Sequence, residues 1–475
     1  MEKTRLSLRL LVSVPILLLL SCHGLTAQTQ KTTPRTFSLE DAINYALQNY
    51  PLTRAASERV TAAQAGVGLA KTSYLPRADM LWQANRATRN NIFGLLLPQS
   101  VISPITGPVL PTTSNESVWG SAAGLLVSWE PFDFGRRSAI VSGARSGEDF
   151  ANSELSVTRL DVSVAVTNAF LTVAAAEQRV SAAKANVDRR QVFANSVQVL
   201  VNNDLRAGAD ASRADAELAR AEVLLIQAEQ AEAVSRAVLA QVLGIPNIDV
   251  QIDPGSLLSI PPNPNAPSPS LTEHPVARSE EARVNQIKAQ EHVLDRSYYP
   301  HFNLQSTIFG RGSGANADGT IETGTNGLGF DRSNWAVGLT VTFPLFDIFS
   351  IHAQKQVEAA NERAERDLYD QTLDDLTGQL RQAQATTDGA RRVAEKTPVE
   401  LRAARDAEMQ ARARYETGLT NVVEVADAQA LLAQAETDDA LALLALWNDL
   451  ALVAAAQGDL KPFLQLLQQN KQGAP

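Results

Sequence analysis

The sequence contains a single cysteine, Cys22, among its 475 residues. An intramolecular disulfide is therefore excluded, and the fold must be held together by packing. Cys22 follows Leu19, Leu20 and Ser21, in the form of a bacterial lipobox, in which the cysteine becomes the acylated first residue. In the alternative, Cys22 is a small apolar residue inside a leader that is cleaved after Ala27. Cys22 is thus a lipid-anchor candidate, and both alternatives stay open.

The sequence also lacks a charge-free apolar run of roughly 20 residues, the length that spans a bilayer as a helix. The apolar run that begins at Leu10 is shorter and follows three basic residues, which is the layout of a secretory signal peptide. We expect a signal peptide over residues 1–27, or a lipoprotein signal over residues 1–21. Membrane contact by the mature, exported chain would then require a β-barrel or a lipid anchor.

Aromatic residues are scarce, whereas Ala, Gln, Glu and Arg are abundant, which favours long helices. The net charge is −10 and no basic cluster is present, which argues against a nucleic-acid partner. The five histidines show no pair at a metal-ligand spacing, and no serine lies in a nucleophile elbow. The glycine-rich stretch at 310–314 is followed by a loop rather than a phosphate-binding helix. We therefore expect no cofactor and no enzyme activity.

An internal repeat organises the chain. Pro51 and Pro275 each open a helical stretch, Pro76 and Pro300 each close it, and the spacing is the same in both copies. A stretch rich in proline, which excludes a helix, separates the copies. We expect a first structural repeat over residues 37–258, a linker over 259–270, a second structural repeat over 271–457 and a polar tail over 458–475.

Two further matches extend the repeat. The segment WEPFD at 129–133 matches FPLFD at 343–347, and LRAG at 205–208 loosely matches RYETG at 414–418. Ala, Val and Leu recur at three- and four-residue spacing over residues 136–203 and 351–415. Each stretch predicts a helix about 100 Å long, which a tubular or coiled-coil assembly would use.

Four short segments alternate with a period of two, at residues 78–90, 118–129, 301–310 and 334–343. One face of each strand is apolar and the other is small or polar, as lipid on one side and a wet lumen on the other require. Trp82, Trp119, Trp129 and Trp335 lie in these segments, where an interfacial aromatic girdle would place them. The alternative is a small soluble sheet with a buried aromatic face. Residues 93–117 and the segment after Gly310 are expected to be exposed loops.

With these motifs in this order, the sequence resembles the TolC-like outer-membrane efflux protein family from about Phe37 to Ala456. The resemblance is carried by FSLEDAI at 37–43, NYP at 49–51, the two Tyr-x-Pro strand entries, the Pro-Phe-Asp and Pro-Leu-Phe-Asp strand exits, and RYETGLT at 414–420.

The resemblance implies an α+β membrane protein that forms a homotrimer, each subunit giving four strands to a shared 12-stranded barrel that continues into a periplasmic α-helical barrel. It also implies an outer-membrane location, with lipid around the barrel. Such a channel is a passive conduit of a tripartite efflux or type I export system. Its partners would be a periplasmic membrane-fusion adaptor and an inner-membrane pump.

The resemblance places the periplasmic helix tips at 206–212 and 415–421, where Gly208 and Gly418 would break the helices. The residues implied in adaptor docking and closure are Arg206, Gly208, Asp210, Arg213, Tyr415, Gly418 and Thr420. Some relatives have a basic residue near Thr420 that helps to lock the closed state, which a threonine does not provide. Arg213 or Asp210 would then belong to a different lock.

Glu424 and Asp427 match the acidic residues that form the narrowest constriction in the family. They lie three residues apart and share a helix face. In a trimer each would form a ring of three carboxylates, whose field attracts cations. The alternative is that both are ordinary solvated helix charges.

Two other classes of protein are alternatives to a channel. A periplasmic coiled-coil scaffold or adaptor would have soluble sheets, and it would not need strand pairs flanked by tryptophan with glycine and threonine on the wet side. A secreted enzyme would need a catalytic constellation, and the sequence shows none.

Overall fold

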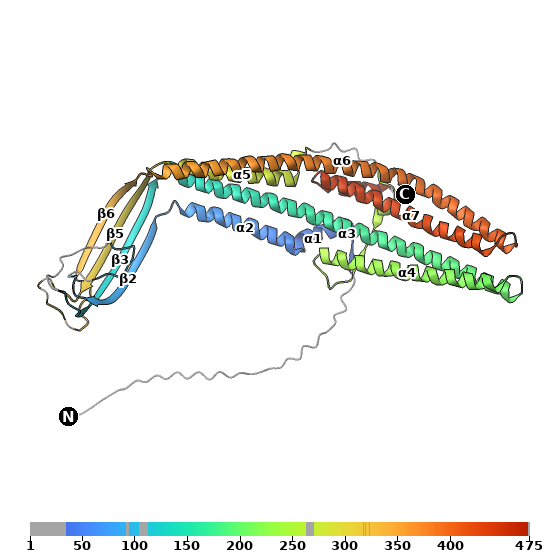
Figure 1. Ribbon diagram of the computed structural model, residues 1–475, viewed down its shortest axis with the longest axis horizontal. Coiled ribbons are helices and arrows are strands. Elements are labelled where there is room, and N and C mark those ends of the chain that lie inside the picture. The colour runs from blue at the N-terminus through green and yellow to red at the C-terminus, as the bar shows by residue number, and fades with distance from the viewer. Residues whose placement is uncertain are drawn as a thin grey trace, which may run out of the picture.

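The computed structural model describes residues 35–91, 95–103, 113–262, 270–316, 318, 320–322 and 324–473. The leader with Cys22 and most of the linker lie outside these residues, so the predictions about them stay predictions. The molecule is elongated, with a β-sheet at one end and two helical hairpin tips at the other (Figure 1).

The two halves of the chain contain the same order of elements. In the first half these are α2 (Pro51–Thr72), β2 (Arg77–Thr88), β3 (Ser117–Phe132), α3 (Arg136–Asn202) and α4 (Gly208–Val242). In the second half they are α5 (Pro275–Arg296), β5 (His301–Ser313), β6 (Arg332–Thr342), α6 (Asp347–Glu416) and α7 (Val422–Ala456). Both long helices and all four strands are confirmed, with bounds that differ from the predicted ones by a few residues.

The sheet is antiparallel, in the order β2-β3-β5-β6. Met80 pairs with Leu125, Leu125 with Ile308, and Ile308 with Trp335, so these apolar side chains form one row across the sheet. β2 and β6 are the two edge strands, and neither has a second partner strand among the described residues. Edge strands of this length normally pair with another strand or are covered by other elements.

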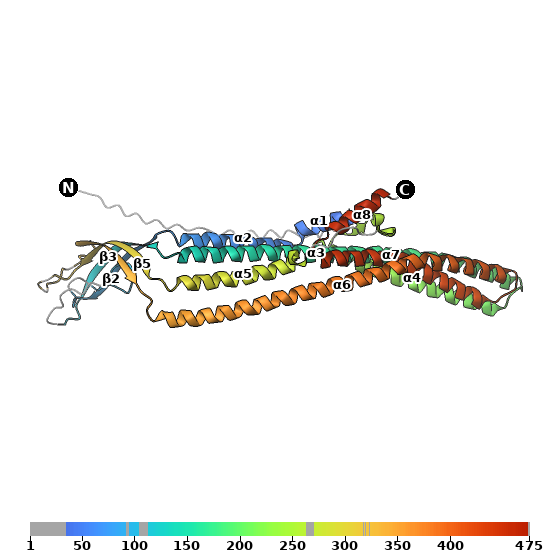
Figure 2. The ribbon, with the colours of Figure 1, turned by 90° about the horizontal axis from the view of Figure 1, so that it is seen from above.

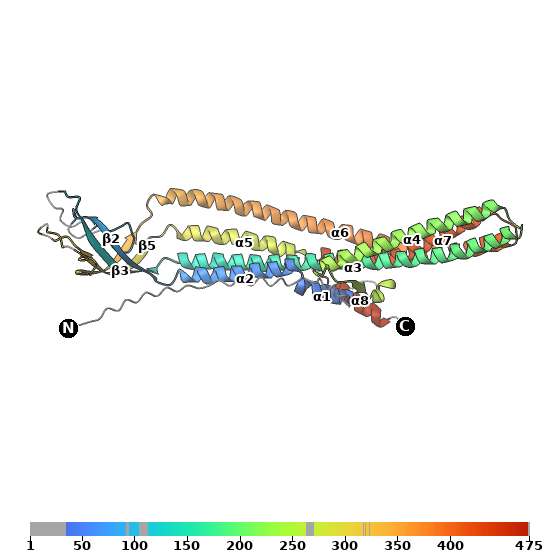
Figure 3. The same ribbon diagram turned by 90° about the horizontal axis from the view of Figure 1, so that it is seen from below.

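The two shorter helices of each half follow one another end to end alongside a long helix (Figures 2 and 3). At one joint α7 ends at Ala456, the chain turns at Gly458, whose φ of +82° suits glycine, and α5 of the same half begins at Pro275. A Cβ on Gly458 would lie 2.7 Å from the ring carbon Cδ2 of His274. His274 accepts a hydrogen bond at Nδ1 from the Val276 amide and donates one from Nε2 to the Ala455 carbonyl.

The largest hydrophobic core lies near the middle of the long axis. There α1 (Leu39–Asn49) and α8 (Lys461–Gly473) pack against α3 and α7, around the buried rings of Phe170, Trp447 and Phe463. The short strands β1 (Arg35–Phe37) and β4 (Val250–Ile252) pair in parallel beside this core. By length and composition, α3 and α7 each contain a stretch apolar enough to cross a membrane. About half of each stretch is buried inside the molecule, so these apolar side chains pack in the hydrophobic core.

Candidate functional site

One face of the sheet is apolar and exposed. Met80 is 81% exposed, Trp335 is 78% exposed, and Trp82, Val337 and Leu339 are also exposed. The opposite face carries polar or small side chains such as Asn303, Gln305 and Thr340 in the strands of the second half. Monomeric soluble proteins rarely expose a contiguous apolar patch of this kind. The pattern fits lipid on one face and water on the other.

The four tryptophans of the sheet do not share one environment. Trp82 and Trp335 are largely exposed on the apolar face, and Trp129 is partly exposed at the helical end of β3. Trp119 is half buried, and the Arg86 guanidinium lies 5.6 Å from its ring centroid. Their role as an interfacial girdle stays a prediction.

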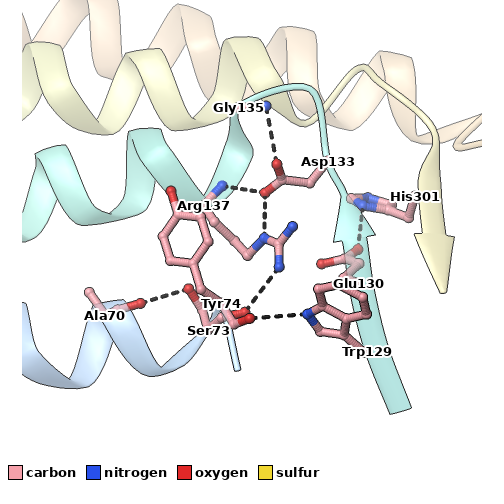
Figure 4. Close-up of polar contacts among 9 residues, drawn as sticks. All are labelled: Ala70, Ser73, Tyr74, Trp129, Glu130, Asp133, Gly135, Arg137 and His301. Carbon is pink, nitrogen blue, oxygen red and sulfur yellow. Dashed lines mark hydrogen bonds and ion pairs between the residues drawn. The ribbon is translucent and has the colours of Figure 1, made fainter. Parts of the chain in front are cut away.

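A buried ion pair joins the sheet to the long helix in the first half (Figure 4). The Arg137 side chain and its backbone amide both donate to Asp133 Oδ2, at 2.9 Å and 2.6 Å. Arg137 also donates to the Ser73 carbonyl, and the Trp129 indole N–H donates to the Tyr74 carbonyl. Burial raises the pKa of Asp133, but the hydrogen bonds and the charge of Arg137 outweigh it, so the net pKa is lowered.

The second half lacks this ion pair. Ile351 lies four residues after Asp347, as Arg137 lies four residues after Asp133. Ile351 is buried as well, but it has no donor for the carboxylate. Sequence reasoning missed the pair, although a carboxylate and an arginine four residues apart at a helix start are a readable signal.

The first helix tip differs from the expectation. Gly208 does not break the helices, because it is the first residue of α4. The break comes earlier, where Asp204 adopts a φ of +59°, and Asp204 corresponds to Gly418, whose φ is +79°. The amide of Leu205 donates to the Leu200 carbonyl, as the amide of Leu419 donates to the Arg414 carbonyl. The loose match between LRAG and RYETG was therefore out of register.

In the corrected register Arg206 corresponds to Thr420, and Asp210 corresponds to Glu424. The spacing from Leu205 to Leu419 is the same as that from Asp133 to Asp347. A basic residue, Arg206, thus occupies on the first tip the position that Thr420 occupies on the second.

Arg206 connects the two tips. Its guanidinium donates to the Tyr415 carbonyl at 2.6 Å and lies 4.5 Å from the centroid of the Tyr415 ring. The Tyr415 hydroxyl donates to Asp210 Oδ2 at 3.3 Å. Tyr415 is 1% exposed and packs edge-on against Phe193. Burial, and next the negative charge of Asp210, raise the pKa of Tyr415, so its hydroxyl stays protonated and keeps donating. We call Arg206, Asp210 and Tyr415 the tip triad.

Glu424 and Asp427 both lie on the exposed face of α7, while Val425 and Ala426 between them are buried. Glu424 pairs with Arg414 at 2.8 Å and accepts a hydrogen bond from Thr420. Among the described residues, Asp427 has no ion pair within 4 Å. Arg213 is exposed on α4 and does not join the tip triad.

Both loops that we expected to be exposed fold differently in part. In the second, β5 continues to Ser313, and Arg311 and Ala315 are 6% and 4% exposed. Val101 and Ile102, within the segment 93–117 that we expected to be exposed, are 8% and 1% exposed. They pack with Ala122 and Phe309 on the face of the sheet opposite to Leu125. The residues of the described stretch 95–103 are called the inner segment from here on.

The described residues contain no group of three His, Cys, Asp or Glu side chains that could hold a metal ion.

An elongated fold with an exposed apolar sheet at one end and paired helical hairpins at the other is the architecture of an outer-membrane channel with a periplasmic extension. A model of the outer membrane efflux protein family matches residues 42–245 and again residues 266–459. The chain belongs to this family, and it is an outer-membrane protein.

Individual proteins agree with this assignment. Protein CyaE of Bordetella pertussis is 25% identical over 404 residues, which cover 82% of this chain and 78% of that protein. The Campylobacter jejuni CmeC outer membrane channel has a TM-score of 0.71 at 16% identity, covering 92% of this chain and 90% of its own. The outer membrane protein VceC of Vibrio cholerae has a TM-score of 0.68 at 19% identity, covering 89% and 97%. The family and these structures are channel proteins rather than enzymes.

Proposed function

We propose that the chain is one subunit of a homotrimeric outer-membrane channel, the passive exit duct of a tripartite efflux or type I export system. The observation that carries this proposal is the sheet: four strands with an exposed apolar face and two unpaired edges. Four strands do not close a barrel, but three copies give twelve, within the range of known outer-membrane barrels. Pairing of β2 with β6 of a neighbouring subunit would remove every edge.

The helices support the same assembly. α3 has 67 residues and α6 has 70, so each is about 100 Å long and extends far beyond any bilayer. Their alanine-rich faces suit close packing of helices side by side into a tube. At the far end Leu205 and Leu419 are 67% and 71% exposed, which suits docking of a periplasmic adaptor that leads to an inner-membrane pump.

Outer-membrane fractionation followed by light scattering of the detergent-extracted particle tests the proposal. A trimer extracted from the outer-membrane fraction is expected. A soluble periplasmic monomer or dimer would contradict the channel and favour a coiled-coil scaffold.

We propose that the tip triad holds the channel closed. Arg206 and Asp210 lie on the α3–α4 tip and Tyr415 lies on the α6–α7 tip, so their bonds tie the two hairpins of one subunit together. Opening by separation of the hairpins would break these bonds. Asp427, three residues after the paired Glu424, would then line the constriction as the unpaired carboxylate of each subunit.

The lipid anchor has a direct test. Incorporation of labelled palmitate into the wild-type protein, and its loss in Cys22→Ala, is expected if the lipobox is used. Absence of label in the wild type would favour cleavage after Ala27.

A further inference from the structure

The inner segment lies on the face of the sheet that a barrel turns toward its lumen. In the register of the sheet, Leu125 and Ile308 share the exposed apolar face, whereas Gly124 and Phe309 point to the other side. Ile102 contacts this other side, because a Cβ on Gly124 would lie only 3.2 Å from Ile102 Cγ1. If lipid covers the apolar face, the inner segment is inside the barrel.

The segment also reaches deep along the strands. Thr307, near the middle of the 13-residue β5, donates a hydrogen bond to the Val101 carbonyl at 3.4 Å. Gly124 lies near the middle of the 16-residue β3. Asn85 of β2 donates to the Leu95 carbonyl. Contacts at mid-strand place the segment within the membrane-spanning height rather than at the rim.

The inner segment is fixed in place by polar contacts. Gln99 Oε1 accepts hydrogen bonds from the amides of Val101 and Ile102, at 2.6 Å and 2.7 Å. These bonds satisfy backbone donors that are buried against the wall. The absence of a side chain at Gly124 provides room for Phe309 of the neighbouring strand, whose Cβ would lie 2.9 Å from an added Cβ, and for Ile102, which explains a glycine in the interior of a strand.

In a barrel of twelve strands, a segment on the inner wall would narrow the lumen considerably. Twelve strands about 4.8 Å apart and tilted by about 40° enclose a backbone radius of roughly 12 Å. A peptide layer packed on the wall takes up roughly 5–10 Å of this radius. Three copies would therefore leave only a narrow passage.

The largest exposed side chains of the segment are apolar, beside the smaller exposed Pro98, Ser100 and Ser103. Leu95 and Leu97 are 52% and 53% exposed, whereas Val101 and Ile102 of the same segment are buried against the wall. Narrow apolar constrictions oppose the passage of ions because water leaves them readily.

We propose that the inner segment forms a constriction inside the β-barrel, and that Leu95 and Leu97 set its width and its apolar character. This inference rests on the proposed trimeric channel. It adds a selective zone within the outer membrane to the closure at the periplasmic tips.

Variants of the full-length protein with one introduced cysteine test the inference. Leu97→Cys is compared with Met80→Cys, which is more exposed in the single chain but faces the lipid side. The probe is a membrane-impermeant cationic thiosulfonate, applied to channels in planar bilayers, with the wild type as the control for Cys22. Modification of Leu97→Cys is expected to lower the conductance at least about twofold, because three adducts would fill the constriction. Met80→Cys and the wild type are expected to keep their conductance.

The outcomes separate the two proposals. Intact trimers in which Leu97→Cys reacts without a change in conductance, or does not react at all, would overturn the constriction and leave the channel standing. A wild type that forms neither trimers nor channels would overturn the proposed function itself. As a second variant, Gln99→Ala removes the bonds that fix the segment and is expected to raise the conductance of otherwise intact trimers.

Discussion

At the scale of single residues, the two helix tips differ at positions that the repeat makes equivalent. Arg206 stands where the second tip has Thr420, and it is Arg206 that reaches across to the carbonyl and the ring of Tyr415. On the second tip, Glu424 is held by Arg414 within its own hairpin. Near the tips the polar connection between the hairpins therefore runs through Arg206 and Asp210, and farther from the tips Arg189 of α3 pairs with Glu436 of α7.

Replacing Arg206 by Ala is expected to open the channel at rest. A hydrogen bond to a charged group contributes about 1.5–3 kcal/mol, so its loss from the closed state would shift the closed–open equilibrium by roughly ten- to a hundredfold. Conductance in planar bilayers measures the shift, and Tyr415→Phe is expected to change it in the same direction. Arg213→Ala, on the same tip but outside the triad, is the control. Unchanged conductance in Arg206→Ala would contradict the lock.

The joint between α7 and α5 predicts a pH dependence. Burial lowers the pKa of His274 in the folded protein, although the bond to the Ala455 carbonyl and the charge of Asp161 act the other way. The unfolded chain therefore binds more protons just below pH 6.5, and stability is lost as the pH falls through that region. Asp161, whose pKa is raised chiefly by burial, gains a proton at lower pH and opposes this loss.

Melting temperatures of detergent-solubilised wild type and His274→Asn between pH 7.5 and 5 check this prediction. Asparagine keeps a helix-capping side chain but does not titrate. The wild type is expected to lose more stability on acidification than the variant. Equal losses in the two proteins would rule out His274 as the cause.

At the scale of elements, β6 shows how the two faces of a strand differ in what they tolerate. All of its residues are exposed in the single chain, so exposure alone does not distinguish the lipid side from the lumen side. The register with β5 does, because Val337 pairs opposite Ser306 and shares a face with Trp335.

Val337→Lys is therefore expected to destabilise the assembled barrel by roughly 2–4 kcal/mol, the cost of a lysine in the middle of the lipid face. Thr340→Lys, on the opposite face of β6, is expected to cost far less. Urea titration of the barrel folded into lipid vesicles measures both. Equal effects of the two substitutions would contradict the assignment of the faces.

The junction between β3 and α3 is a second element-scale feature. The side chains of Arg137 and Asp133 are 6% and 9% exposed, so removing one partner leaves the other charge buried. Arg137→Leu is expected to lower the free energy of unfolding by about 3–5 kcal/mol. The double variant Arg137→Leu with Asp133→Asn is expected to recover part of this lost stability, because it no longer buries an unpaired charge. The midpoint of denaturant unfolding measures the recovery, and a double variant as unstable as the single one would argue against the ion pair as the cause.

At the scale of the whole molecule, the trimer would turn single charges into rings. Three copies of Asp427 would concentrate negative charge at the periplasmic constriction and favour cations. Glu424 would contribute less, because Arg414 compensates its charge. Asp427→Ala is thus expected to lower the preference for cations more than Glu424→Ala. Reversal potentials in asymmetric salt measure the preference, and an unchanged preference in the double variant would exclude the rings.

Much of the architecture follows from local pattern. The three- and four-residue periodicity of α3 and α6 predicts two helices of about 100 Å, and the period of two in the strands predicts the exposed apolar row at Met80, Leu125 and Trp335. These periods are readable because they express which face of an element is buried. The helix break was misplaced at Gly208, because here Asp204 adopts the conformation that glycine usually takes.

The sequence by itself determined the duplicated order of elements and the family, and it predicts an export signal, because these are read from local patterns and from their order along the chain. Only the tertiary structure decided that Arg206 reaches Tyr415, that Asp133 is paired with Arg137 in one half alone, and that the inner segment lies against Gly124 and Phe309. Such contacts join side chains that folding brings together from distant elements, or depend on burial that no local period records. Local sequence patterns therefore do not show them.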